Sequence, residues 1–167
     1  MRRLVQAASA LLLVGLAACA TRGLESFALE ADDLHASLAP RALERANHGV
    51  PEGVSESPHL ATDAEGVESI ARFASQGRLG GEDLRSALFA LYDEEGELGV
   101  YGLETATPEG ADRLEIELRG IWNTNVDLER ARVHRGGRVL LVVWNDHVSR
   151  ECWRAVNEEL AERLDVR

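Results

Sequence analysis

Residues 130–144 read RARVHRGGRVLLVVW, and this stretch decides the fold. Two extended segments are separated by Gly136-Gly137, and a glycine pair between such segments is typical of a tight hairpin turn. The second segment, Val139 to Trp144, is apolar at every position. A strand of this kind is expected to be covered on both faces. The stretch therefore predicts an antiparallel hairpin whose second arm is a central strand.

A helix is expected directly after this hairpin, over residues 150–164. Ser149 can cap its N-terminus, because a serine hydroxyl accepts a hydrogen bond from an amide in the first turn. The apolar residues recur at helical spacing, so they share one side of the helix. They are Trp153, Val156, Leu160 and Leu164. We expect this side to pack on the sheet.

Further strands are expected before the hairpin. Residues 86–92 (SALFALY) and 97–105 (ELGVYGLET) flank the acidic turn 93–96 and predict a second hairpin, although Leu84, Leu88 and Leu91 would also suit a helix. Residues 113–119 (RLEIELR) alternate apolar and charged side chains, which predicts a half-exposed strand. The central region therefore predicts an antiparallel meander of about five strands.

The first part of the chain predicts helices and a linker. Apolar residues follow one helical face from Leu24 to Leu38, and a second short helix is expected over residues 64–76. Between them, residues 49–63 contain two prolines and two glycines and are expected to form a loop or linker. Together these elements predict an α+β fold of N-terminal helices, the meander and a C-terminal helix packed on the sheet.

The composition limits the partners of this 167-residue chain. Its 29 acidic residues face 18 basic ones, all of them arginines, which gives a formal net charge of −11. Nucleic-acid binding needs a basic surface that neutralises phosphates. The acidic balance argues against a nucleic-acid partner and is ordinary for one folded domain.

The N-terminus has the layout of a secretory signal. Arg2 and Arg3 precede an uncharged stretch from Leu4 to Ala20, which is too interrupted and short for a typical membrane-spanning helix. The stretch ends in LAAC, residues 16–19, which resembles the lipobox of bacterial lipoproteins. The resemblance covers the first 19 residues alone.

This resemblance implies cleavage between Ala18 and Cys19 and attachment of acyl chains to Cys19 and to the new amino terminus. Residues 1–18 are then a signal peptide, 19–63 a lipidated N-terminal segment with helix and linker, and 64–167 a small α+β domain. The mature chain keeps 16 arginines against 29 acidic residues, a net charge of −13. Ala20 after the cysteine favours a lipid anchor in the outer membrane, facing the periplasm.

Cys152 is the candidate for thiol chemistry. It follows Asp146 and His147 in WNDHVSREC, and a cysteine near a helix N-terminus can be held as a thiolate. The alternative is an inert, half-buried thiol at the edge of the helix's apolar side. Because acylation occupies Cys19, the chain has no partner for Cys152 in a disulfide.

Other site types have little support in the sequence. The histidines at 35, 48, 59, 134 and 147 lack metal-ligand spacing, the acidic turn lacks an EF-hand pattern, and no phosphate-binding glycine motif occurs. We therefore expect no metal and no cofactor. Trp122, Trp144 and Trp153 could line an apolar ligand groove, or they could be core residues.

These observations favour a lipid-anchored envelope protein with a small non-catalytic domain that binds an envelope protein or a small apolar ligand. One alternative is an envelope thiol enzyme or redox protein that uses Cys152 with His147 and Asp146. A second alternative is a carrier of lipid or another apolar ligand, which would need a cavity between sheet and helices.

The substitution Cys19→Ser tests the anchor. We expect it to leave an unprocessed precursor without incorporated palmitate, because lipid attachment requires the thiol sulfur. Gel mobility and radiolabelled palmitate in a bacterial host measure both effects, and Cys152→Ser is the matched control that should mature normally. Normal processing and membrane retention of Cys19→Ser would contradict the lipoprotein assignment.

Overall fold

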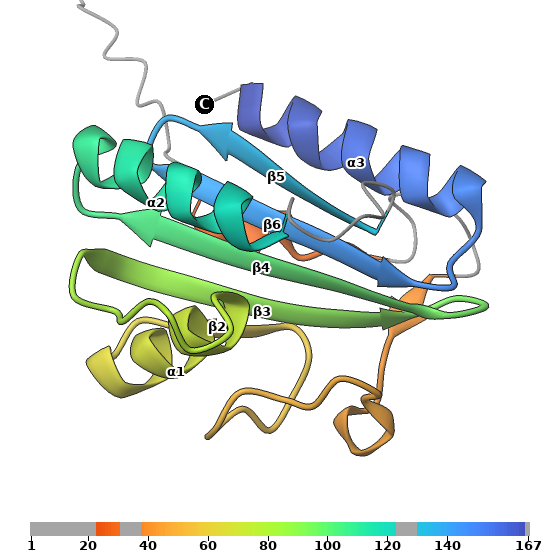
Figure 1. Ribbon diagram of the computed structural model, residues 1–167. Helices are drawn as coiled ribbons and strands as arrows, with labels where there is room; N and C mark the ends of the chain where they lie inside the picture. Colours follow the sequence, from red (N-terminus) through yellow and green to blue (C-terminus); the bar gives the residue numbers. More distant parts are fainter. Residues whose placement is uncertain (1–22, 31–37, 123–129, 166–167) are drawn as a thin grey trace, which may run out of the picture.

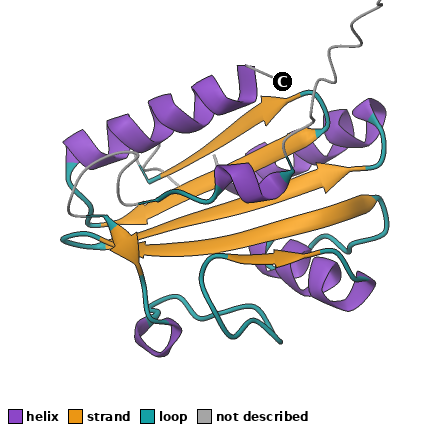
Figure 2. Cartoon of the chain, turned by 180° about the vertical axis from the view of Figure 1, so that it is seen from behind, coloured by secondary structure: helices purple, strands orange, loops and turns teal. Residues whose placement is uncertain are grey.

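One antiparallel sheet separates two helical layers in the computed structural model, which describes residues 23–30, 38–122 and 130–165. Helices α1 (Ala64–Ala74) and α2 (Pro108–Trp122) cover one face of the sheet (Figure 1). Helix α3 (Arg150–Asp165) and the 3-10 turn η1 (Leu24–Phe27) cover the other face (Figure 2). The predicted α+β class, with the C-terminal helix packed on the sheet, is confirmed.

The described residues form a sheet of six strands. They are β1 (Ala39–Pro40), β2 (His59–Ala61), β3 (Leu84–Asp93), β4 (Glu97–Thr105), β5 (Ala131–Gly136) and β6 (Val139–Asp146). The order is β1-β3-β4-β6-β5, and β2 also pairs with β3. Both predicted hairpins are present, as β3–β4 and β5–β6. Because α2 carries the chain across the sheet, β6 lies between β4 and β5, and the strands do not follow one another in strict sequence order.

Strand β6 is buried on both faces, as its sequence predicts. It pairs with β4 on one side and β5 on the other. Alternate side chains enter two separate cores, because successive residues of a strand point to opposite faces. The α3 side receives Val139, Leu141 and Val143, and the α1–α2 side receives Leu140, Val142 and Trp144.

The strand predicted for residues 113–119 is wrong, because this segment lies within α2. Thr107 and Pro108 start the helix: the Thr107 hydroxyl accepts from Gly110 N at 3.1 Å, and proline suits the first helical position. The residues that reach the core have helical spacing, and they are Ala111, Leu118 and Ile121. Ile116, which the alternating pattern placed inside, has 74% of its surface exposed. The helix-start residues Thr107 and Pro108 therefore decide the structure of this segment, and the short alternation of apolar and charged residues does not.

In the described residues before α1, the chain forms only short 3-10 turns in place of the predicted helix. The turn η1 covers Leu24–Phe27, and part of the predicted helix, residues 31–37, lies outside the described residues. A second 3-10 turn, η3, spans Leu43–Arg45. Leu24, Phe27 and Leu38 are fully buried on the α3 side of the sheet. Within the predicted loop 49–63, residues His59–Ala61 form β2 and pair with β3.

Helix α3 begins at the predicted cap. The Ser149 hydroxyl accepts from Cys152 N at 3.2 Å and donates to Glu94 Oε1 at 2.7 Å. The acidic turn of the β3–β4 hairpin thereby holds the start of α3. Among the described residues, none of the helices is both long and apolar enough to cross a membrane.

A half-buried histidine joins α3 to the edge strand β5. His134 Nε2 lies 2.7 Å from Asn157 Oδ1, and Asn157 Nδ2 donates to Trp153 O at 2.7 Å. Burial lowers the pKa of His134, and the charges of Arg132 and Arg119 add to this effect, while the bond to Asn157 opposes it. The neutral imidazole is therefore favoured in the folded state.

This pKa shift predicts a loss of stability in mild acid. Between the lowered folded pKa and the ordinary value of 6.5, the unfolded chain binds more protons, so the free energy of unfolding falls as pH falls through this range. We expect His134→Gln to show a weaker dependence between pH 7.5 and about 5.5. Denaturant unfolding at several pH values measures it, and His147→Gln is the exposed control. Equal pH dependence of His134→Gln and the unmodified chain would contradict this role.

Candidate ligand-binding cleft

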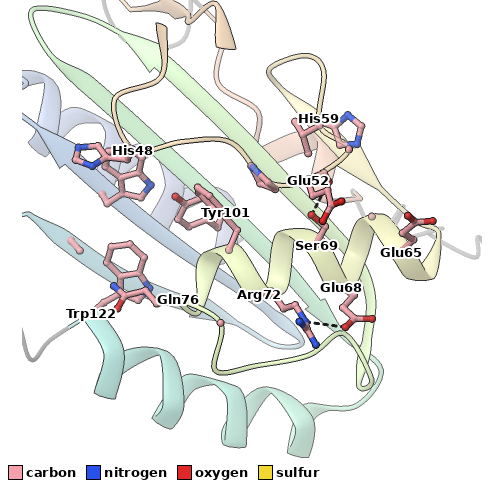
Figure 3. A pocket seen from close by; sticks show the side chains of 18 of the residues that line it. His48, Glu52, His59, Glu65, Glu68, Ser69, Arg72, Gln76, Tyr101 and Trp122 are labelled. Atoms are coloured by element: carbon pink, nitrogen blue, oxygen red, sulfur yellow. Dashed lines mark hydrogen bonds and ion pairs between the residues drawn. The ribbon is translucent and has the colours of Figure 1, made fainter. Parts of the chain in front are cut away.

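A cleft of about 1630 Å³ opens on the α1–α2 side of the sheet. Its walls are helix α1 and the loop from His48 to Val54, and its floor is made of aromatic side chains from β4, β6 and the end of α2 (Figure 3). The segments that form it are far apart in sequence. The cleft therefore exists through tertiary packing and strand register.

Three rings form what we call the aromatic floor: Tyr101, Trp122 and Trp144. The centroid of Tyr101 lies 6.1 Å from that of Trp122 and 6.3 Å from that of Trp144, with interplanar angles of 39° and 31°. Phe89 stacks beside Tyr101 at 5.9 Å, which continues the row toward α1. Such small tilts between neighbouring rings produce a surface on which a flat or apolar group can lie.

Trp122 joins the two helices that border the cleft. Its indole N–H donates to Ala74 O at 2.9 Å, so the last residue of α2 is bound to the last residue of α1. The side chain is only partly buried, and it lines the cleft. A tryptophan that is held by a hydrogen bond and still open to the cleft is a suitable contact for a ligand.

Trp144 lies over Gly99, its partner in the β4–β6 register. A Cβ atom at position 99 would lie 2.2 Å from Trp144 Nε1, so a side chain there would displace the indole. The indole is 7% exposed, and its Nε1 atom is buried without a hydrogen-bond partner in the described chain. The absence of a side chain at Gly99 therefore allows the Trp144 indole to lie close to β4.

The same end of the floor carries polar side chains. His48 stands edge-on to Trp144 with centroids 5.1 Å apart, and its Nε2 lies 3.2 Å from Asp146 Oδ2. Glu97 is completely buried: Oε2 accepts from Asn47 N at 2.9 Å, and Oε1 has no partner among the described residues. A buried oxygen without a hydrogen bond lowers the free energy of unfolding, so this end of the floor reduces the stability of the fold.

The electrostatics of Tyr101 reflect this setting. Burial raises the pKa of Tyr101 above its usual range, the neighbouring Trp144 indole lowers it to a smaller extent, and the negative charge of Glu97 raises it further. The hydroxyl is therefore protonated at neutral pH.

The rim of the cleft is mostly acidic. The Ser69 hydroxyl donates to Glu52 O at 2.7 Å, which binds the loop to α1, and Arg72 pairs with Glu68 at 2.9 Å (Figure 3). Five carboxylates and two guanidinium groups line the cleft, a formal charge of −3 with neutral histidines. These are Glu52, Asp63, Glu65, Glu68 and Asp146, with Arg72 and Arg130.

Only part of the predicted tryptophan groove comes together. Trp122 and Trp144 share the cleft, whereas Trp153 belongs to the core on the α3 side of the sheet. The sequence reasoning missed Tyr101, His48 and Glu97. The alternation of β4 contains a signal for two of them, because Glu97, Gly99 and Tyr101 all fall on the face that receives Trp144.

The predicted thiol group is not assembled. Cys152 is 2% exposed in the α3-side core, and burial raises the pKa of its thiol to about 11, with Glu94 adding to the effect. The His147 side chain is 78% exposed and lies near Asp146, with Nε2 3.4 Å from Oδ1. In the described chain, no hydrogen bond joins the Cys152 sulfur to either residue. This arrangement favours the inert-thiol interpretation.

The acidic residues of the β3–β4 hairpin contact different partners. Asp93 pairs with Arg41, Glu94 binds Ser149, and Glu97 is buried beneath the Asn47 amide. Across the ranges that the structure describes, histidine, cysteine and carboxylate side chains do not gather into a group of three able to hold a metal ion.

Comparisons with protein-family models, curated proteins and solved structures find no match for this chain.

The contact between Gly99 and Trp144 predicts the effect of a single methyl group. We expect Gly99→Ala to move the indole, alter tryptophan fluorescence and lower the free energy of unfolding by about 1–3 kcal/mol. Gly102→Ala is the matched control on the same strand, because its nearest neighbour would be Leu88 Cβ at 3.1 Å on the opposite face. A fluorescence spectrum unchanged in Gly99→Ala would contradict the contact.

Proposed function

We propose that this protein is a lipid-anchored envelope binding protein whose cleft holds a small ligand with an apolar part. The aromatic floor is the observation that carries the proposal. Aromatic side chains normally fill the core, yet Trp122 remains partly open in a cleft larger than the roughly 300–1,000 Å³ usual for small-molecule sites. The apolar floor with a few polar groups at one end has the composition of such a site.

The predicted anchor suits a binding protein. Two or three acyl chains on Cys19 would hold the domain at a membrane, because each buried methylene contributes about 0.8 kcal/mol. The acidic domain would be repelled by an anionic lipid surface. The cleft would then remain open to the aqueous side of the envelope.

The two alternative functions have weaker support. A thiol enzyme needs an accessible thiolate, whereas Cys152 is buried and its pKa is raised. A lipid carrier needs a long apolar tunnel that shields acyl chains from water. The cleft instead has carboxylates along its rim and polar side chains at one end.

Native mass spectrometry of the chain after incubation with a low-molecular-weight cell extract tests the proposal. We expect adducts that are strongly reduced in Trp122→Ala, because this substitution removes one ring of the floor. Ile116→Ala is the matched control, since Ile116 is an exposed residue of the same helix. Absence of adducts, or adducts equally retained by Trp122→Ala, would contradict a ligand site in the cleft.

A further inference from the structure

We propose that the cleft recognises an organic cation, an alkylammonium or quaternary ammonium group that rests on the aromatic floor beside Asp146. This inference rests on the proposed binding function and names the chemical class of the ligand. Three observations support it: the arrangement of the rings, the charge of the lining, and the unpaired carboxylate oxygen of Glu97 at one end of the floor.

The rings are arranged to face a bound cation. Aromatic faces carry partial negative charge and attract a cation within about 6 Å of the ring centroid. Tyr101, Trp122 and Trp144 are consecutive in the floor, with centroids 6.1 and 6.3 Å apart and modest tilts. Trp122 is the most open of the three rings, while Tyr101 and Trp144 line the cleft with 3% and 7% of their surface exposed. An ammonium group on Trp122 would therefore lie next to the small exposed parts of the other two rings.

The lining selects the sign of the ligand's charge. Of the two arginines there, Arg72 is engaged by Glu68 at 2.9 Å. Within the described residues, the ion-pair partners of Asp146 are imidazoles, His48 at 3.2 Å and His147 at 3.4 Å. A carboxylate next to Trp144 is thus not neutralised by a guanidinium group. An anionic ligand would be repelled, and a cation would be attracted.

The polar end of the floor holds one buried acceptor without a donor. Glu97 is completely buried and its Oε1 has no partner in the described chain, while its negative charge acts on Tyr101. Asn47 and His48 cover this end of the floor, and His48 also lines the cleft. A buried carboxylate close to aromatic faces increases the attraction for a cation above them.

Choline and its neutral isostere 3,3-dimethyl-1-butanol provide a matched pair of probes. The full chain, labelled with 5-fluorotryptophan in maltoside micelles, contains three tryptophans that report separately by ¹⁹F NMR. Their resonances are assigned with single Trp→Phe variants. Trp153 is the internal control, because it lies on the opposite side of the sheet.

We expect choline to shift the Trp122 and Trp144 resonances saturably, to leave Trp153 unchanged, and to bind about tenfold more tightly than the alcohol. Asp146→Asn keeps the shape of the side chain and should weaken choline binding about threefold without changing alcohol binding. Asp165→Asn, an exposed carboxylate on α3, is the control and should leave both unchanged. An unshifted Trp153 resonance in Asp146→Asn verifies that the variant is folded.

Equal binding of choline and the alcohol would overturn the cation inference, because apolar contact alone would then account for binding. No binding of choline would overturn it as well. Neither result contradicts the proposed function, which is tested by the Trp122-dependent adducts from cell extract. The two proposals can therefore fail separately.

Discussion

The burial of β6 on both faces is the constraint on which the other elements depend. Its six residues from Val139 to Trp144 are all nearly inaccessible to solvent, so the strand needs a neighbour on each edge and a layer on each side. Strands β4 and β5 supply the edges, and the helices supply the layers. Helix α2 is what permits this order. It carries the chain across the sheet between β4 and β5, so that β6 can return between them.

The alternation of β6 also produces the cleft. At Trp144 the strand has nearly reached its end, and the residue still points to the α1–α2 side, where Leu140 and Val142 are core residues. The indole lies over Gly99 and beside Tyr101, at the border of this core. The aromatic floor is therefore a continuation of the core at a place where the helices do not close over the sheet. Position 99 must lack a side chain for the floor to form.

Elements with local signals could be predicted from the sequence, whereas the site could not. Both hairpins have turn residues between extended segments, and α3 has a serine cap and a regular apolar side. The alternation in residues 113–119 was misleading because Thr107, six residues before the segment, and Pro108 start a helix that includes the whole segment. The cleft depends on register. Tyr101 and Trp144 are 43 positions apart, and only the pairing of Gly99 with Trp144 brings their rings together.

The two sides of the sheet differ in how completely their polar atoms are satisfied. On the α3 side, Asn157 bonds to both His134 and Trp153, and Ser149 is bound to Glu94. On the cleft side, Glu97 Oε1 and Trp144 Nε1 are buried without a partner among the described residues, a defect of about 1–3 kcal/mol for each atom. A fold that retains such atoms at one end of an open cleft is less stable than it could be. A positively charged ligand would offset the charge of the buried carboxylate and so recover part of the lost stability on binding. The fold already holds the carboxylate and the rings in position, so binding needs little further ordering.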